Sequence, residues 1–413
     1  MEPTTVRNKI IGQIQHMLDH AVIKNRRFLD DEQLIKAEQL AVLEEIFNAN
    51  VRDAEIRELS SHFAPVLRRD HPVHLAIWGK TGTGKTLTVS YFLNLLAQMC
   101  SEKNVALRYK HLDLSTPMPC FRALNDLACL LNASKRYKKG ISLEELMLRI
   151  EAALVHYDGY LVLFVDEVDN LRRDKDTFMT FLVRRLPQRT RARLILVFVS
   201  NRLDWPDHLD PRVRSFLKLN EIVFKPYDAV DLQRILSIRV EKALHSDAVE
   251  AGVIEKVAAL ASRDHGDARQ AVALLAKSAY LAEKAGTPVS LEVVDHACSE
   301  IEQDKYVTMI RTAPRQLQAA MGAVIQCVTS HGRDKGETSE VYHIYKAYCQ
   351  KAELRPLTQR AFGDMLNELD MYSLLRSHVI SRGRYGRTRE ITVDLPEDLT
   401  GRIYEEIKRS LDM

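Results

Sequence analysis

A short glycine-rich segment, "GKTGTGKT", has the residue types needed to hold a chain of phosphates. Residues 79–86 satisfy the pattern Gly-x-x-x-x-Gly-Lys-Thr, directly after an apolar run and directly before a helical pattern. The glycines let backbone N–H groups close around phosphates, and the helix N-terminus adds its positive dipole. We expect the lysine to reach the β and γ phosphates of a nucleotide, and the threonine hydroxyl to hold magnesium. The candidate nucleotide ligands in this loop are Gly79, Lys80, Thr81, Gly82, Thr83, Gly84, Lys85 and Thr86.

A second segment, "LVLFVDEVDNL", places an acidic pair at the end of an apolar strand. We expect Asp166, together with Thr86, to bind magnesium, and we count Asp166 among the nucleotide ligands. Glu167 is placed to polarise the water that attacks the γ phosphate. The apolar run "RLILVFVSN" ends on Asn201, whose amide could orient the same water. These residues together predict nucleotide hydrolysis.

Three arginines are candidates for stabilising the charge that develops during hydrolysis. Arg269 falls in the first turn of a predicted helix capped by Asp267, where a cation opposes the helix dipole unless an anion lies nearby. We therefore expect it to contact the nucleotide. Arg212 and Arg214, in "LDPRVRSFL", could reach the nucleotide of a neighbouring subunit. A solvated arginine beside a cap, or a salt-bridged helix start, explains the same residues, and the choice between Arg212 and Arg214 is open.

Near the end of the chain, "SRGRYGRTREI" carries much positive charge on a short stretch. Residues 376–389 contain five arginines, a histidine and no acid. Strand-like runs flank the segment, so its glycines suit a turn with positive φ. A charged edge that prevents aggregation is an alternative, but mixed charge would serve that purpose equally. We expect the arginines to contact the DNA backbone.

The helix before this hairpin has the pattern of a recognition helix. Thr358 can cap it, and an apolar stripe at i, i+3, i+4 and i+7 predicts one buried face. Its other face begins with polar residues and a glycine, which suits the end that enters a major groove. With the hairpin, the candidate DNA-binding residues are Gln359, Arg360, Gly363, Arg382, Arg384, Tyr385, Arg387 and Arg389.

The elements that position these residues form three regions. Near-continuous apolar runs at 73–79, 105–114, 160–167, 193–201 and 220–226 alternate with helical patterns, which predicts a doubly wound α/β domain with a five-stranded parallel sheet. Four amphipathic helices follow, and then helices with a basic hairpin, the order of a winged helix. We therefore expect an ATPase base domain with an N-terminal extension over 1–226, a helical lid over 227–305 and a winged helix over 306–413.

The composition excludes several classes of protein. Of 413 residues, 46% are apolar and 28% charged, the balance of a globular chain rather than a disordered one. No segment has the length of a membrane span, and the start lacks the apolar core of a secretory signal. The six cysteines include no Cys-x-x-Cys pair, which argues against structural zinc and fits a reducing compartment. We expect a soluble, cytoplasmic protein.

Taken together, these motifs resemble the AAA+ replication initiators, the origin-recognition and cell-division-cycle family, in its compact archaeal form. "IWGKTGTGKT", "VDEVDNL", "SNRLDW", "LDPRVRS", "GDARQAV" and "SRGRYGRTREI" occur in the family's order. The resemblance implies an AAA+ P-loop ATPase domain, a helical lid and a C-terminal winged helix. It also implies that Asn201 is the first sensor, Arg269 the second, and Arg212 the arginine finger.

The family further carries a DNA-contacting insertion between its second and third strands. Here that region contains "KRYKKG", so the resemblance adds Lys135, Arg136, Lys138 and Lys139 to the candidate DNA ligands, although a soluble surface loop would have the same charge.

For function, the resemblance implies a nucleoid-associated initiator that binds duplex origin DNA and recruits the replicative minichromosome-maintenance helicase. ATP or ADP with Mg²⁺ would be its ligands, slow hydrolysis its switch, and paralogous initiators possible partners. Two alternatives stay open: a paralogue that regulates transcription, and an AAA+ signalling or transposition switch whose winged helix binds protein.

Overall fold

The computed structural model describes residues 21–30, 40–131, 140–263, 266–330, 335–381 and 387–413. The chain divides into two compact units, the first ending at Val294 and the second beginning at Asp295. Among the described residues no helix is long and apolar enough to cross a bilayer.

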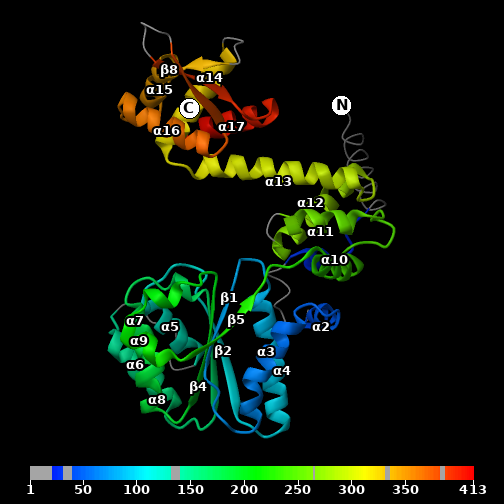
Figure 1. The fold of residues 1–413 in the computed structure, drawn as a ribbon, viewed down its shortest axis with the longest axis vertical. Coiled ribbons are helices and arrows are strands. Elements are labelled where there is room, and N and C mark those ends of the chain that lie inside the picture. Colours follow the sequence, from blue (N-terminus) through cyan, green and yellow to red (C-terminus); the bar gives the residue numbers. More distant parts are fainter. Residues whose placement is uncertain (1–20, 31–39, 132–139, 264–265, 331–334, 382–386) are drawn as a thin grey trace, which may run out of the picture. The chain divides into compact units, whose positions relative to one another are not determined.

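The first unit is built on one parallel sheet, as the sequence predicts (Figure 1). Its strands are β1 (His74–Gly79), β2 (Leu107–Asp113), β3 (Tyr160–Asp166), β4 (Arg193–Ser200) and β5 (Leu219–Phe224), in the order β2-β3-β4-β1-β5. Every residue of β3 is buried. The near-continuous apolar runs arise because helices cover both faces of the sheet.

Two hydrophobic cores lie on opposite faces of this sheet. One contains the apolar sides of α3 (Asp53–Leu67) and α4 (Lys85–Glu102). The other is covered by helices that Figure 1 shows together on the far side of the strands: α5 (Cys120–Leu130), α6 (Leu143–Leu154), α7 (Lys175–Thr180), α8 (Leu186–Arg189) and α9 (Pro211–Leu217). The carboxyl ends of the buried strands therefore carry the polar motifs at one edge of the sheet.

The lid follows β5 as a series of helices: α10 (Ala229–Ala243), α11 (Val253–Arg263), α12 (Ala268–Ala285) and the start of α13 (Leu291–Thr312). Two earlier elements, η1 (Arg26–Leu29) and α2 (Leu40–Asn48), pack against α10. The backbone N–H groups of Lys24 and Asn25 both donate to the carbonyl of Ala243, at 2.7 and 2.9 Å. The described segment from Lys24 to Leu29, together with α2, thus packs with the lid.

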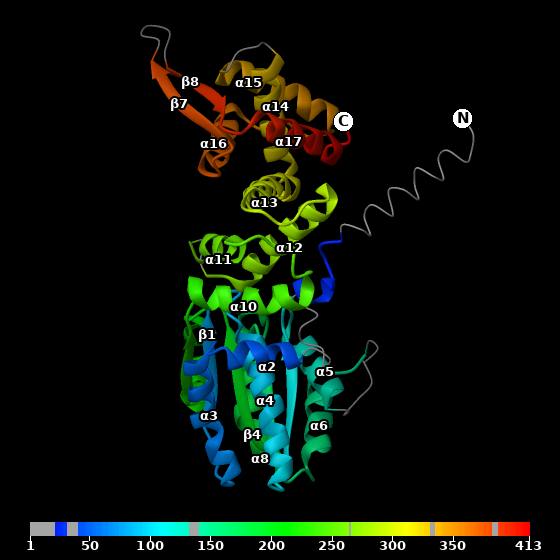
Figure 2. The same ribbon diagram turned by 90° about the vertical axis from the view of Figure 1, so that its right-hand side faces the viewer.

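The second unit has the elements of a winged helix (Figure 2). They are α14 (Arg315–Ser330), β6 (Gly336–Glu337), α15 (Thr338–Lys351), α16 (Gln359–Met371), β7 (Leu375–Ser381), β8 (Arg387–Val393) and α17 (Glu397–Ser410). The sheet order is β6-β8-β7, so a short third strand joins the two that the sequence predicts. The predicted lid boundary at 305/306 lies inside α13, which continues without a break from the lid to the winged helix.

Candidate functional site

The glycine-rich loop lies between β1 and α4, where the sequence places it. Gly82 and Gly84 have φ values of 74° and 77°, in the region that glycine occupies most readily. A pocket of about 670 Å³ opens at this loop. Its lining contains most of the predicted nucleotide ligands and catalytic residues: Thr81, Gly82, Thr83, Gly84, Lys85, Thr86, Asp166, Glu167, Asn201 and Arg269. Gly79 and Lys80 do not line the pocket, but their carbonyl oxygens accept hydrogen bonds from Lys85 Nζ.

Lys85 is a buried cation of this pocket. Its Nζ donates to the carbonyls of Gly79 and Lys80 at 2.8 and 2.7 Å, and to Oδ1 of Asn201 at 2.9 Å. Burial lowers the pKa of Lys85 to about 8, and the Asp166 carboxylate partly opposes that shift. A cation held this way lacks a full counter-charge, so an anionic ligand would stabilise it.

Thr86 and Asp166 form a pair of oxygen ligands of the kind magnesium prefers. Thr86 Oγ1 donates to Asp166 Oδ2 at 2.7 Å, from the first turn of α4 to the end of β3. The described residues contain no group of three or more His, Cys, Asp or Glu side chains that could hold a metal by themselves. Mg²⁺ in nucleotide sites is commonly held by few protein oxygens plus the phosphates, so this pair fits it.

Glu167 lies at the pocket wall with an unusual backbone, φ 52° and ψ 44°. Its Oε2 accepts a hydrogen bond from Asn170 Nδ2 at 2.9 Å. Burial, followed by the nearby Asp166 and Asp113 carboxylates, raises the pKa of Glu167. A carboxylate with a raised pKa is a better proton acceptor, which suits a general base. The role of Asn170 in holding Glu167 could not be read from the motif.

Asn201 is positioned by the residue before it. Ser200 is fully buried, and its Oγ donates to Asp169 Oδ1 at 2.6 Å, which ties the end of β4 to the loop after β3. The Asn201 amide oxygen then faces Lys85 Nζ. The structure thus brings the predicted first sensor within hydrogen-bonding distance of the loop lysine.

The lid meets the phosphate loop at the start of α12. The Ala268 N–H donates to the Gly82 carbonyl at 3.2 Å, and Asp267 caps the helix by accepting from the Arg269 N–H at 2.8 Å. The cap therefore forms as predicted, and the Arg269 side chain lines the pocket from the lid side. Glycine is required at position 82 because a Cβ there would meet Asp267 Oδ1 at 1.7 Å.

One part of the pocket wall is apolar and was not predicted. Leu43, Ile46 and Phe47 of α2, Ile235 of α10 and Tyr227 line it beside the loop. An apolar slot next to a phosphate loop has the chemistry to hold a planar base. The sequence gives little signal for it, because α2 lies outside the sheet pattern and meets α10 only in the folded chain.

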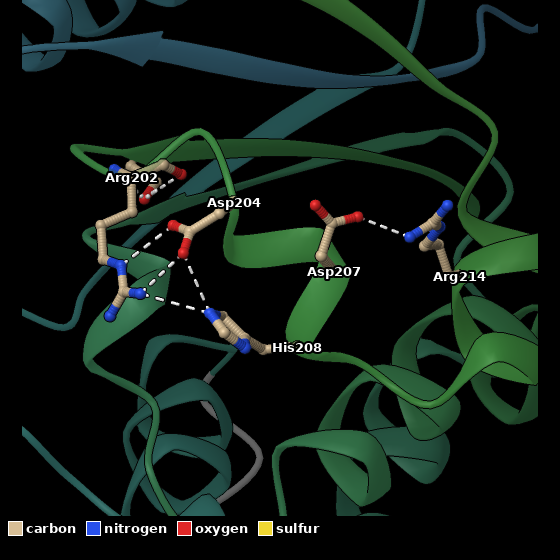
Figure 3. Close-up of polar contacts among 6 residues, drawn as sticks. Arg202, Asp204, Asp207, His208 and Arg214 are labelled. Carbon is tan, nitrogen blue, oxygen red and sulfur yellow. Dashed lines mark hydrogen bonds and ion pairs between the residues drawn. The ribbon is translucent and has the colours of Figure 1, made fainter.

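The two finger candidates differ in their surroundings, and Figure 3 shows those of Arg214. Arg214 Nη1 bonds Asp207 Oδ1 at 2.5 Å, beside a separate network in which Asp204 bonds both Arg202 and His208. Within the part of the chain that the structure describes, the exposed Arg212 side chain has no hydrogen bond or ion pair, although its N–H bonds the cap Asp210. Arg212 is therefore the freer of the two to reach another molecule.

In the winged helix, α16 has the predicted cap and stripe. Thr358 Oγ1 accepts from the Ala361 N–H at 3.3 Å. The predicted apolar side chains are buried: Phe362, Met365, Leu366 and Leu369. Gln359 and Arg360 are exposed at the start of the helix, and a Cβ on Gly363 would meet nothing within 4 Å. This end of α16 is open to a ligand.

The wing strands β7 and β8 pair antiparallel, with Ser381 opposite Arg387. Arg389 Nη1 donates to Asn367 Oδ1 at 2.5 Å, so this arginine also braces β8 against α16. The tip residues Arg382, Arg384 and Tyr385 lie outside the described residues, as do the loop residues Lys135, Arg136, Lys138 and Lys139.

Three family models match successive parts of the chain. They are described as an AAA domain over residues 68–204, a Cdc6 AAA+ ATPase-type lid domain over 233–299, and the CDC6 C-terminal winged helix domain over 308–402. Their order and kinds agree with the predicted AAA+ base, lid and winged helix.

The chain is also similar to curated and solved proteins along most of its length. An ORC1-type DNA replication protein of Pyrococcus abyssi is 33% identical over 380 residues, covering 88% of this chain and 90% of that protein. ORC1-type DNA replication protein 1 of Archaeoglobus fulgidus is 35% identical over 358 residues, 86% of each chain. The structure of the Aeropyrum pernix ORC1 protein in complex with DNA matches with a TM-score of 0.68 and 28% identity, over 94% of this chain and 97% of that one. By these matches, the chain belongs to the family of ORC1-type DNA replication proteins.

Proposed function

We propose that this chain is an ATP-regulated initiator that binds duplex DNA at a replication origin and recruits the replicative minichromosome-maintenance helicase. The observation that carries the proposal is a pocket in which a phosphate loop, an acidic pair and a lid arginine meet. The same chain ends in a winged helix with a basic wing. Family membership supplies the link to replication, and the origin and helicase are inferred from it.

In the proposed complex, the apolar slot takes the adenine base and the loop takes the phosphates. Lys85 would exchange its carbonyl partners for the β and γ phosphates, since a charged acceptor makes a stronger bond than a neutral one. Magnesium, held by Thr86 and Asp166, would neutralise the phosphate charge. Glu167 would accept the proton of the attacking water, which Asn201 would orient.

Hydrolysis in this scheme acts as a slow switch. Arg269 would bind the γ phosphate from the lid, so the triphosphate would hold lid and base together more firmly than ADP does. The lid already contacts the loop through Gly82, so loss of the γ phosphate would weaken an existing interface. A paralogue or second copy could supply Arg212 to this phosphate in trans.

For DNA binding, we propose that the start of α16 enters a major groove while the wing follows the backbone. The exposed Gln359 and Arg360 have the donors and acceptors to read base edges. The arginines of the wing would neutralise phosphates. The relative solved in complex with DNA supports DNA binding itself, because it matches nearly the whole chain.

The test is duplex binding over a salt series, with and without ATP, for wild type and Arg384→Ala/Arg387→Ala. We expect weaker binding and a salt slope flatter by about one unit per lost phosphate contact. The matched control is Arg315→Ala/Arg409→Ala, two exposed arginines on α14 and α17. This variant removes the same charge elsewhere in the same unit and should change neither the affinity for DNA nor the salt slope by much. Wild-type binding by the wing variant would instead favour a winged helix that binds protein, and footprints on promoters but not origins would favour a transcriptional regulator.

A further inference from the structure

Arg52, at the start of α3, is a buried cation in an unfavourable setting. Its side chain is 5% exposed, and its backbone is left-handed, with φ 68° and ψ 24°. Among the described residues its buried Nε has no hydrogen-bond partner. A left-handed backbone and an unpaired buried donor each destabilise a fold, whereas the ion pair with Glu55 offsets the buried charge. Their coincidence at one residue suggests that its other contacts serve a purpose.

Those contacts join three segments that are distant in sequence. Nη2 donates to the carbonyl of Thr83 in the phosphate loop at 2.9 Å, and to the carbonyl of Lys225, just after β5, at 2.6 Å. Nη1 donates to Glu55 Oε1 at 2.7 Å. The guanidinium carbon lies 3.9 Å from the ring centroid of Tyr227, in the segment that leads into the lid. The planar fork of arginine allows all of these contacts at once.

The bond to Thr83 has a consequence for the loop. A trans peptide directs its C=O and its N–H to opposite sides, and the structure contains no cis peptide bond among the described residues. With the Thr83 carbonyl held by Arg52, the N–H of Gly84 must point away from Arg52, and both residues of this peptide line the pocket. The cation also polarises this peptide, which makes the N–H a stronger donor to an anion.

The same guanidinium fixes the start of the lid. The Tyr227 N–H donates to the Gly266 carbonyl at 3.1 Å, and Gly266 directly precedes Asp267, the cap of α12. Tyr227 itself lines the pocket, and a Cβ on Gly84 would lie 2.2 Å from its hydroxyl. Arg52 therefore holds one loop peptide and the lid entrance in a single arrangement.

We propose that Arg52 is a positioning residue for nucleotide binding: it orients the Thr83–Gly84 peptide toward the phosphates. This inference rests on the proposed function, because it assigns a role within the same nucleotide pocket. It predicts that Arg52 matters for ligands that carry phosphates and much less for the base and ribose.

The experiment measures the affinity of the full-length protein for a fluorescent ADP, with ATP, ADP and adenosine as competitors. Arg52→Ala should weaken the affinity for ATP and ADP about tenfold or more, the effect of one lost hydrogen bond to a charged group. The affinity for adenosine should change less than about twofold. The matched control is Arg57→Ala, on the same helix, whose side chain is 81% exposed and, within the described part of the chain, pairs only with Asp53. This variant should bind all three ligands as wild type does.

Arg52→Lys keeps the charge but cannot bridge two carbonyls and stack on a ring, so it should recover only part of the lost affinity. This variant also carries the test if Arg52→Ala does not fold. Equal losses for adenosine and ADP would show a general structural role, and full recovery by lysine would show that charge alone suffices; either result overturns the inference. Wild type that binds neither ATP nor ADP would instead refute the proposed function.

Discussion

The contact between Gly82 and the lid provides the sharpest test of how the pocket is closed. In Gly82→Ala the new Cβ would overlap the Asp267 carboxylate, at 1.7 Å from Oδ1 and 2.1 Å from Cγ. The carboxylate must move, so α12 loses its cap; where the first turn of α12 moves with it, the Ala268 N–H also loses the Gly82 carbonyl. Each of these interactions contributes about 1 kcal/mol. If both also support the closed pocket, nucleotide affinity should fall about 30-fold.

The substitution has a second effect that a matched variant can remove. Alanine at a positive φ destabilises the fold by about 1–2 kcal/mol wherever it occurs. Gly252, in the lid, has φ 87° and its nearest neighbour would lie 3.7 Å from a Cβ, so Gly252→Ala carries the backbone penalty without the clash. We would measure urea unfolding and ADP binding of both variants by titration calorimetry. Equal ADP affinity in the two variants would refute the proposed coupling between lid and loop.

Three further predictions concern the nucleotide pocket and the arginine that a neighbouring subunit would supply to it. Burial lowers the pKa of Lys85 from 10.5 to about 8, so the unfolded chain binds more protons than the folded chain between these pH values. The free energy of unfolding of the nucleotide-free protein should therefore rise from pH 8 to 10.5, relative to that of Lys85→Met. Urea unfolding measures this difference. Glu167→Gln should leave the Kd for ATP within about threefold and slow single-turnover hydrolysis at least 100-fold, whereas unchanged hydrolysis would exclude Glu167 as the base. Arg212→Ala should reduce hydrolysis only at protein concentrations that favour association, and Arg214→Ala should instead lower the melting temperature slightly through the lost Asp207 pair.

Local sequence patterns were sufficient for most of the fold. The central strands β1, β3 and β4 were visible because strands buried on both faces must be apolar throughout, and the loop motif lies between β1 and a helix. The N-cap of α16 and its apolar face were also predictable, because both depend on residues close together in the sequence. The two-residue strand β6 was missed because it is too short to give a periodic signal. The lid boundary was placed inside α13 because the chain between Pro288 and Pro314 contains no proline or glycine to mark an end.

The supporting residues of the site were harder to predict. Arg52 and Thr83 are 31 residues apart, and Arg52 and Lys225 are 173 apart, so no spacing rule relates them. Asn170 follows the acidic pair closely, yet asparagine is so common in loops that its bond to Glu167 gives no distinct pattern. Motifs identify groups that contact a ligand, because those must have particular chemistry. Residues that orient them can be of many types.

The central claim is that this chain binds two kinds of phosphate at two separate places. The most direct test titrates ATP and a duplex, each alone, into wild type, Lys85→Ala and Arg384→Ala/Arg387→Ala. We predict that Lys85→Ala no longer binds ATP but keeps the wild-type salt slope of DNA binding, measured without nucleotide. The wing variant should keep ATP binding and lose part of that slope. Wild-type DNA binding by the wing variant, or ATP binding by Lys85→Ala with wild-type affinity, would contradict the account.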